Sequence, residues 1–375
     1  MSGQILFNGN IASPNDFIDR IAPFVKQSNP RGSPNVLLIT AAWGAGEYGE
    51  APFREALNRH GVLSQWQDGF DRAIPNLCAW HAWQEVLAAR PQVAQVAEEL
   101  EEVADAVRRF YIAKTSFHAT RVREAVAFSR DKLGEFRLGD LPLIGRDGLQ
   151  PEPTLAGRAL LHRALTRELS HDLADLVRND ARMLDALTEL ADALPARTGL
   201  RFDPLWRQWH ATLTARILAA DTVILPGGDP DALLGALQFF DLGPALRETL
   251  RRGALLCAVS AGSLVLCERV IIYDDFASDP RRREFRLHDR GLGLVGGLQI
   301  LPHCMDRIHT DDPDNLAYLA RRFSTHACVG LNQESFLLVQ PDAGKATAVG
   351  LHDAVYVFGP DGAKRRFMPG QVLDV

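Results

Sequence analysis

Few cysteines, no long apolar runs and no excess of positive charge limit what this chain can be. Its 375 residues include five cysteines, an odd number without any CxxC spacing, which argues against a disulfide framework or a zinc ribbon and favours a reducing, cytoplasmic location. No apolar run approaches the about 20 residues that span a bilayer, and we expect no signal peptide. The net charge of −6 argues against a nucleic-acid-binding protein.

What is present is an ordinary globular composition, with 46% hydrophobic and 23% charged residues. Strand-like and helix-like segments alternate at both ends of the chain, which indicates an α/β fold with a mostly parallel sheet flanked by helices. The predicted strands are 36–42, 221–225 and 254–259, and the predicted helices are 52–60, 231–240 and 243–251. Short runs from 329 to 358 are typical of antiparallel edge strands.

The middle of the chain is different. Residues 84–130 and 155–195 are rich in Ala, Leu, Glu and Arg, with apolar residues at helical spacing. We therefore predict an α/β domain formed by residues 1–65 and 216–375, and a large all-helical insertion at 66–215. The insertion could serve as a lid over a site or as a module that binds a partner.

The segment 255–263, Leu-Leu-Cys-Ala-Val-Ser-Ala-Gly-Ser, is the strongest functional signal. A buried strand leads into Ser260, small residues and a helix, which is the context of a nucleophile elbow, although Ala258 replaces the first glycine of the G-x-S-x-G pattern. The N–H groups at the start of the helix would face a developing oxyanion. The alternative is that Ser260 only caps the helix.

Two further segments follow predicted strands. Gly227 and Gly228 end the strand 221–225, and a backbone N–H there suits one arm of an oxyanion hole, with the N–H of Ala261 as the other arm. His303 follows the strand-like run 300–302, where it could act as the base for Ser260. Ordinary turns and a structural histidine are the alternatives.

Together these segments resemble the serine-peptidase family of dipeptidase E and cyanophycinase. The resemblance rests on the order and spacing of Pro-Gly-Gly-Asp at 226–229, Ser-Ala-Gly-Ser at 260–263, Gly-Leu-Gly-Leu at 291–294 and Pro-His at 302–303. It implies the fold of the class I glutamine amidotransferase domains. It also implies that Ser260 is the nucleophile, His303 the base, and Gly228 and Ala261 the oxyanion donors.

The family resemblance further implies an acid about fifteen positions after the serine, which falls on Asp275, with Asp274 as the alternative and Glu334 as a weaker one. The Pro-His step is closer to the dipeptidase E pattern, which implies a small peptide substrate of aspartyl type. No metal and no organic cofactor is expected, nor any nucleic acid or membrane, and a homodimer is left open.

Rival interpretations of other features are weaker. A catalytically degenerate family member that acts as a binding scaffold is the second hypothesis for the whole chain. His309, Asp311 and Asp312 could suggest a metal site, but no matching ligand set accompanies them, so a helix-capping loop is expected. Gly44 and Gly46 do not complete a dinucleotide-binding pattern. Cys257 lies within the strand before Ser260 and is expected to face the core.

Overall fold

A seven-stranded sheet forms the centre of the computed structural model, which describes residues 3–28, 34–62, 75–134, 136–141, 157–273, 285–350 and 354–373. In the described part of the chain the strands follow the order β13-β10-β9-β1-β4-β3-β2. The parallel half contains β1 (Gln4–Asn8), β4 (Leu255–Val259), β3 (Thr222–Leu225) and β2 (Val36–Leu38). The antiparallel half continues through β9 (Ser335–Gln340), β10 (Lys345–Gly350) and β13 (Val372–Leu373).

Helices cover both faces of the parallel half of this sheet, and its strands β2, β3 and β4 are buried throughout. On one face, Leu6 and Leu38 pack with α1 (Pro14–Ser28) and α2 (Ala51–Arg59). On the other face, Ile5 and Phe7 belong to a larger core. That core includes residues of α3 (Ala79–Ala89), α6 (Pro204–Ala219), α7 (Pro230–Phe239), α8 (Gly243–Arg251) and α9 (Ala261–Leu266).

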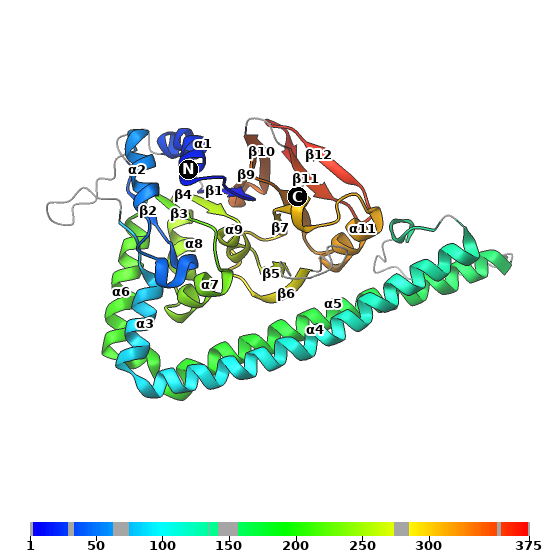
Figure 1. Cartoon of the computed structure of the whole chain (residues 1–375), viewed down its shortest axis with the longest axis horizontal. Coiled ribbons are helices and arrows are strands. Elements are labelled where there is room, and N and C mark those ends of the chain that lie inside the picture. The colour runs from blue at the N-terminus through cyan, green and yellow to red at the C-terminus, as the bar shows by residue number, and fades with distance from the viewer. Residues whose placement is uncertain are drawn as a thin grey trace.

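A second sheet, in the order β12-β11-β8-β7, lies beside the first (Figure 1). Its strands are β7 (Leu298–Pro302), β8 (Ala327–Leu331), β11 (Val355–Phe358) and β12 (Lys364–Phe367). Two short helices, α10 (Cys304–Arg307) and α11 (Pro313–Arg322), connect β7 to β8. A separate ribbon pairs β5 (Arg269–Tyr273) with β6 (Phe285–Arg290).

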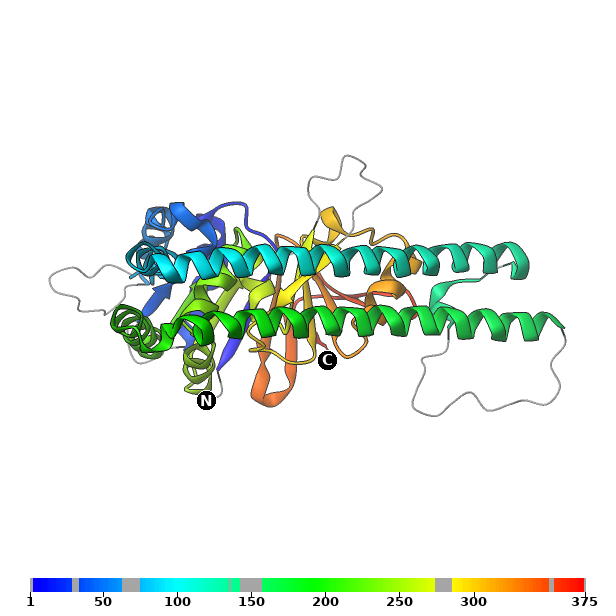
Figure 2. The same ribbon diagram turned by 90° about the horizontal axis from the view of Figure 1, so that it is seen from below.

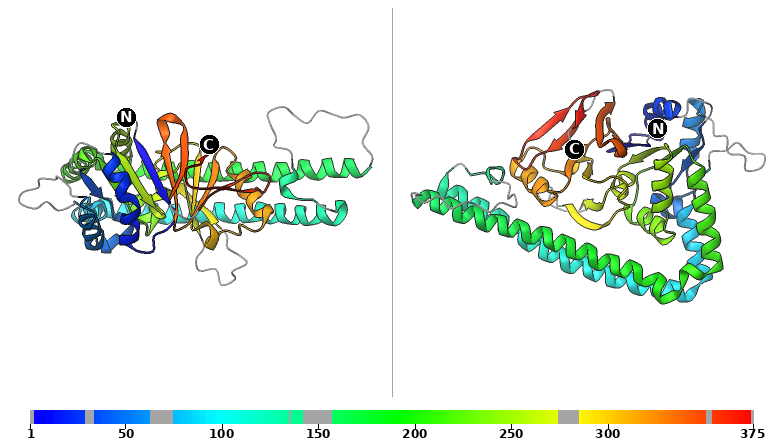
Figure 3. Two further views of the ribbon diagram at one scale, coloured as in Figure 1. Left: turned by 90° about the horizontal axis from the view of Figure 1, so that it is seen from above. Right: turned by 180° about the vertical axis from the view of Figure 1, so that it is seen from behind.

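Two long helices make up the large helical insertion. α4 (Pro91–Leu133) and α5 (Gly157–Thr198) run side by side below the body and extend well beyond it (Figures 1 and 2). Figure 3 shows from behind that the pair leaves the body at a corner formed with α3 and α6. α3 and α6 themselves pack against α7 and α8 of the body. The boundaries 66–215 therefore stay a prediction.

The insertion also contacts the body along its length. Arg108 of α4 lies 3.5 Å from Asp289 of β6. Arg322 of α11 makes a two-pronged, buried ion pair with Asp180 of α5, at 2.6 and 2.8 Å. These two contacts hold the long helices α4 and α5 against strand β6 and helix α11. They thereby fix the direction in which the two helices run.

The structure confirms the predicted fold class and corrects several elements. The predicted strand 36–42 ends at Leu38, because residues 41–46 wind into the 3-10 helix η1 (Ala41–Gly46), where Gly44 has a positive φ of 52°. The stretch 84–130, with its helical spacing, is divided between two helices that meet at Arg90, before Pro91. β8 is not purely antiparallel, since it pairs parallel with β7. No helix in the described ranges is long and apolar enough to cross a bilayer.

Candidate active site

Ser260 occupies a strained turn between β4 and α9. Its backbone has φ 48° and ψ −107°, a region that side-chain-bearing residues rarely adopt. The five residues of β4 are buried, and the N–H of Ser260 donates to the carbonyl oxygen of Asn8 at 3.1 Å. The end of β1 therefore holds the turn in place, as a nucleophile elbow requires.

The hydroxyl of Ser260 makes no capping hydrogen bond to α9, so the alternative that Ser260 only caps this helix does not hold. Its Oγ lies 2.9 Å from Nε2 of His303. The supporting hydrogen bonds come from Ser263 instead, whose hydroxyl donates to the carbonyl oxygens of Asn8 and Ala258, both at 3.0 Å. One serine of the motif thus holds the turn, and the other faces an imidazole.

Gly262 explains why the motif contains a glycine. A Cβ at this position would come within 2.4 Å of the carbonyl oxygen of Leu225. The first turn of α9 therefore lies directly against the end of β3. Any larger residue would push the helix away from the strand that ends in the diglycine.

His303 begins the turn after β7 and precedes α10. Its backbone is left-handed, with φ 53° and ψ 35°, so both members of the Ser-His pair lie on uncommon backbone. β7 is buried throughout, and the carbonyl oxygen of His303 accepts the N–H groups of Asp306 and Arg307 at 3.1 and 2.9 Å. The two residues are 43 positions apart in the chain and come from different sheets.

The diglycine lies beside this pair. A Cβ on Gly227 would come within 3.1 Å of the Cβ of Ser260. Gly228 has φ 145°, and a Cβ there would approach the carbonyl oxygen of Ala42 to 2.5 Å. The same oxygen accepts the N–H of Asp229 at 2.8 Å, so η1 fixes the turn.

Trp43 was not singled out by the sequence analysis, yet it fixes the orientation of a peptide group at the site. Its indole Nε1 donates to the carbonyl oxygen of Gly227 at 2.9 Å. The described part of the chain has no cis peptide bonds, so the N–H of Gly228 lies in the same peptide plane and points in the direction opposite to the carbonyl group of Gly227. No local sequence signal could have found Trp43, since the two residues are 184 positions apart.

These segments line one pocket of about 390 Å³. Trp43, both glycines, Ser260 and His303 all contribute to its wall. The remaining lining residues are Asn10, Ile11, Pro226, Pro230, Val259, Ala261, Leu264, Ile271, Ile272 and Arg307. Ala261 is the first residue of α9, so its N–H has no acceptor within the helix. The ends of β3, β4 and β7 thus meet at one pocket, whose wall combines apolar and polar side chains with the guanidinium group of Arg307.

The acid expected to complete the site is not placed. Asp275 and its alternative Asp274 lie outside the described residues. Glu334, the weaker choice, makes an ion pair with Arg20 at 3.0 Å. Among the described residues, the pocket therefore brings together Ser260, His303, Gly228 and Ala261.

Cys257 lies in the core, as expected. It is fully buried, and burial raises the pKa of its thiol well above the ordinary value of 9.0. A thiolate, the reactive form of cysteine, is therefore strongly disfavoured at this position. The residue at the turn itself, Ser260, carries a hydroxyl group.

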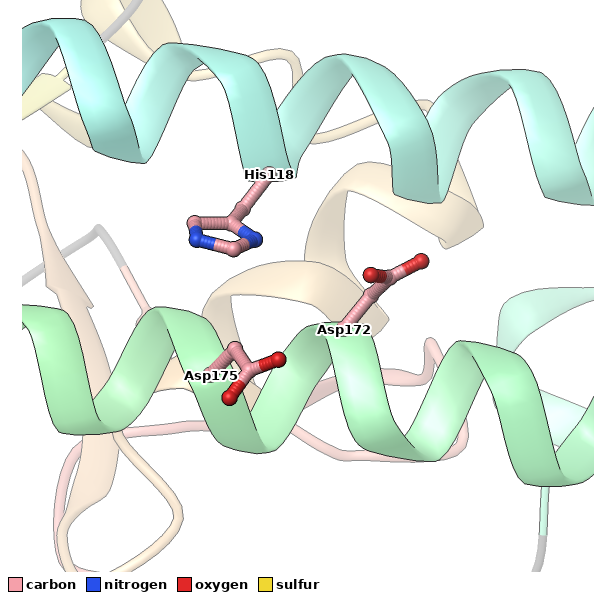
Figure 4. A group of neighbouring side chains, drawn as sticks. All are labelled: His118, Asp172 and Asp175. Atoms are coloured by element: carbon pink, nitrogen blue, oxygen red, sulfur yellow. The ribbon is translucent and has the colours of Figure 1, made fainter.

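Among the described residues, one cluster of metal-ligating groups has suitable spacing. His118 of α4 faces Asp172 and Asp175 of α5, with ligand atoms within 4.8 Å of one another (Figure 4). Arginine side chains already bind both carboxylates: Arg121 lies 3.2 Å from Asp172, and Arg178 pairs with Asp175. This cluster lies on the long helices, and none of its residues lines the Ser260 pocket.

The loop at 309–312 behaves as a capping loop. The carboxylate of Asp312 accepts the N–H of Asp314 at the start of α11, at 2.9 Å. Asp311 lies 3.2 Å from Nζ of Lys364. Gly44 and Gly46 likewise belong to the 3-10 helix η1.

One protein family matches the part of the chain that holds these segments. Residues 191–347 match the model of peptidase family S51. No curated protein matches the sequence. Among solved structures, a peptidase from an acI-B1 Actinobacterium aligns with 100% of this chain and 97% of its own, at 14% identity and a TM-score of 0.46. A Peptidase E candidate from Listeria monocytogenes EGD-e aligns with 37% of this chain and 64% of its own, at 15% identity and a TM-score of 0.27.

The family match covers the diglycine, the elbow and the histidine in one continuous segment. The match to peptidase family S51 thus falls on the same segment whose motifs resemble dipeptidase E and cyanophycinase.

Proposed function

We propose that the chain is a serine peptidase that hydrolyses a short peptide or isopeptide bond through an acyl-enzyme. The observation that carries the proposal is the 2.9 Å separation between Oγ of Ser260, on its strained elbow, and Nε2 of His303. A serine hydroxyl is a weak nucleophile until an adjacent base removes its proton, and this distance allows that transfer.

In the proposed first step, Oγ of Ser260 attacks the substrate carbonyl carbon while Nε2 of His303 takes the hydroxyl proton. The N–H groups of Gly228 and Ala261 stabilise the negative charge on the carbonyl oxygen. The C–N bond then breaks, and the leaving amine takes the proton from His303. Water attacks the ester in the second step, with His303 again as the base, and the carboxylic acid leaves Ser260.

We propose Asp275 as the acid that holds the imidazole of His303 in the productive tautomer. The proposed preference for aspartyl-type substrates comes from the resemblance to dipeptidase E. Arg307 supports it, because this residue contributes to the pocket wall beside Ser260 and His303. A guanidinium group is well suited to bind a carboxylate.

A fluorophosphonate probe tests the mechanism directly. Such a probe modifies activated serines, so we expect labelling of the folded chain at Ser260 and none in the Ser260→Ala variant. Ser28→Ala is the matched control, because Ser28 lies at the end of α1 and does not line the Ser260 pocket, and this variant should still be labelled at Ser260. A folded chain that remains unlabelled would favour the binding-scaffold hypothesis.

Substrate class needs a separate measurement. A panel of aspartyl and isoaspartyl dipeptides, with glutamyl and alanyl dipeptides as controls, would be assayed with the wild-type chain and with Ser260→Ala. Hydrolysis of only the aspartyl members supports the proposed preference. Equal hydrolysis of alanyl dipeptides would contradict the preference while leaving the serine mechanism intact.

A further inference from the structure

Ser260 and His303 come from two separate sheets, so their separation of 2.9 Å depends on the segments that join those sheets. One such segment lies between β8 of the second sheet and β9 of the first. It consists of residues 332–334, which we call the β8–β9 turn. The carbonyl oxygen of Asn332 accepts the N–H of Ser335 at 3.3 Å, which closes this turn.

The β8–β9 turn supplies the cap of the helix that follows the histidine. The first N–H groups of a helix have no acceptor within it, and the side chain of the residue before the helix commonly binds one of them. His303 precedes α10, but its side chain makes no capping hydrogen bond and instead faces Ser260. Oδ1 of Asn332 accepts the N–H of Met305, the second residue of α10, at 3.1 Å.

The same oxygen of Asn332 binds the first residue of α10. Sγ of Cys304 donates to Oδ1 at 3.3 Å, and Cys304 is fully buried. A Cβ on Gly330 of β8 would come within 2.8 Å of that sulfur, so α10 lies closely against β8. The left-handed backbone of His303, with φ 53°, is an uncommon conformation that persists only where its surroundings hold it. One amide oxygen thus holds both residues that follow His303.

The β8–β9 turn is also joined to the serine. The carbonyl oxygen of Asn8, at the end of β1, accepts the N–H of Ser260 at 3.1 Å. The side-chain amide of Asn8 is fully buried and donates to the carbonyl oxygens of Gln333 and Ser335 at 2.9 and 3.0 Å. The turn therefore contacts the residue that holds the serine elbow as well as the helix that follows the histidine.

We propose that Asn332 is a positioning residue for His303, and that through it the β8–β9 turn sets the separation of Ser260 and His303. This inference rests on the proposed serine mechanism. Among the described residues, Asn332 does not line the Ser260 pocket, so it acts through α10 and not on the substrate. Its loss should therefore slow the chemical step and change substrate binding little.

Steady-state kinetics tests this role. Asn332→Ala should lower kcat about tenfold to a hundredfold with KM nearly unchanged, because a displacement of about 1 Å in a catalytic group can cost about a hundredfold in rate. Asn332→Ser, whose hydroxyl is too short to reach Met305, should show the same loss and replaces the Ala variant if that one does not fold. Asn332→Asp should remain close to the wild type, since its carboxylate can accept the same N–H group.

Asn315→Ala is the matched control. It removes the hydrogen bond of 3.2 Å from Nδ2 of Asn315 to the carbonyl oxygen of His309, in the same connection between β7 and β8 but outside the Ser260 pocket. This variant should keep the kcat of the wild type. An equal loss of kcat in Asn315→Ala would mean that the whole connection is sensitive, and would overturn the specific role of Asn332.

Hydrogen exchange measures the cap without relying on activity. In the peptide that contains α10, the N–H of Met305 should exchange faster in Asn332→Ala and Asn332→Ser than in the wild type and in Asn332→Asp. Unchanged exchange, an unchanged kcat in Asn332→Ala, or an equal loss of kcat in the Asp and Ala variants would overturn the proposal. A wild type that shows the exchange difference but no fluorophosphonate labelling would contradict the proposed function and still support the capping of α10 by Asn332.

Discussion

The indole Nε1 of Trp43 donates a hydrogen bond to the carbonyl oxygen of Gly227, at 2.9 Å. That single contact sets the plane of the Gly227–Gly228 peptide group, and with it the direction of the N–H proposed to bind the oxyanion. Trp43 touches no reacting atom in this scheme. It acts as a positioning residue for the peptide group next to Ser260.

Replacing Trp43 with Phe should lower kcat about tenfold to a hundredfold and leave KM nearly unchanged, because losing an oxyanion donor costs about a hundredfold or more. Phenylalanine keeps an aromatic ring beside Phe53, whose ring centre lies 5.7 Å from that of Trp43. Steady-state kinetics on the best dipeptide substrate measures the effect. Trp83→Phe, which changes a tryptophan outside the pocket, should leave both constants unchanged. A rise in KM alone would contradict the positioning role.

The identity of the acid can be decided by three neutral substitutions. Asp275→Asn should lower kcat by about 10⁴-fold, since the imidazole loses the partner that fixes its tautomer. Asp274→Asn and Glu334→Gln should have little effect on kcat. The carboxylate of Glu334 already forms an ion pair with Arg20. Kinetics of the three variants on one substrate provides the measurement. If Asp274→Asn is the inactive variant, the assignment moves by one residue.

The buried thiols of Cys267 and Cys328 should make the stability of the chain depend on pH in the alkaline range. Burial raises the pKa of Cys267 and of Cys328 from 9.0 to about 12. The unfolded chain then loses these protons from about pH 9, whereas the folded chain keeps them. The free energy of unfolding should therefore be unaffected by these groups below pH 9 and fall as the pH rises from 9 towards 12.

Thermal unfolding between pH 7 and pH 11 checks this expectation. Cys267→Ala should lose stability overall, since it opens a small cavity, but its curve should fall less steeply above pH 9 than that of the wild type.

Iodoacetamide at pH 8 should leave the peptidase activity of the native chain unchanged. Rapid inactivation by iodoacetamide would show that a thiol takes part in the reaction.

Breaking the ion pair between Asp180 and Arg322 should strongly lower the free energy of unfolding. Burial alone lowers the pKa of Arg322, but the charge and hydrogen bonds of Asp180 and Tyr318 outweigh it and leave that pKa raised. Asp180→Ala should therefore destabilise the chain by about 3–5 kcal/mol, because it leaves a buried charge without its partner.

Urea unfolding measures this change. Asp180→Leu combined with Arg322→Met should recover most of the loss, since a well-packed apolar pair replaces a buried ion pair at little cost. Glu99→Gln, which breaks the exposed pair with Arg197 at 2.8 Å, should leave stability nearly unchanged. A similar loss in both single variants would contradict the distinction between buried and exposed pairs.

The sequence predicted those parts of the molecule that depend on local pattern. The buried run 255–259 followed by small residues is enough to predict the strand, the sharp turn and the helix after Ser260. The strand 36–42 was predicted too long, because Ala41 and Ala42 are as apolar as a strand although they start a 3-10 turn. Apolar content alone does not distinguish the two.

Long-range contacts account for what the sequence did not reveal. Asn8 joins β1 to the elbow through its carbonyl oxygen, and its side-chain amide donates to the carbonyl oxygens of Gln333 and Ser335 at 2.9 and 3.0 Å. These partners are more than 300 positions away. Neither Asn8 nor Trp43 has a local signature, since each acts only where distant segments meet.

Glu99, near the start of α4, forms an ion pair with Arg197, near the end of α5, although 98 positions separate them. The start of α4 and the end of α5 therefore lie next to each other, where the long helices join the rest of the structure. A change in the length of the helical pair at its far end would therefore not reroute any strand that leads to Ser260 or His303.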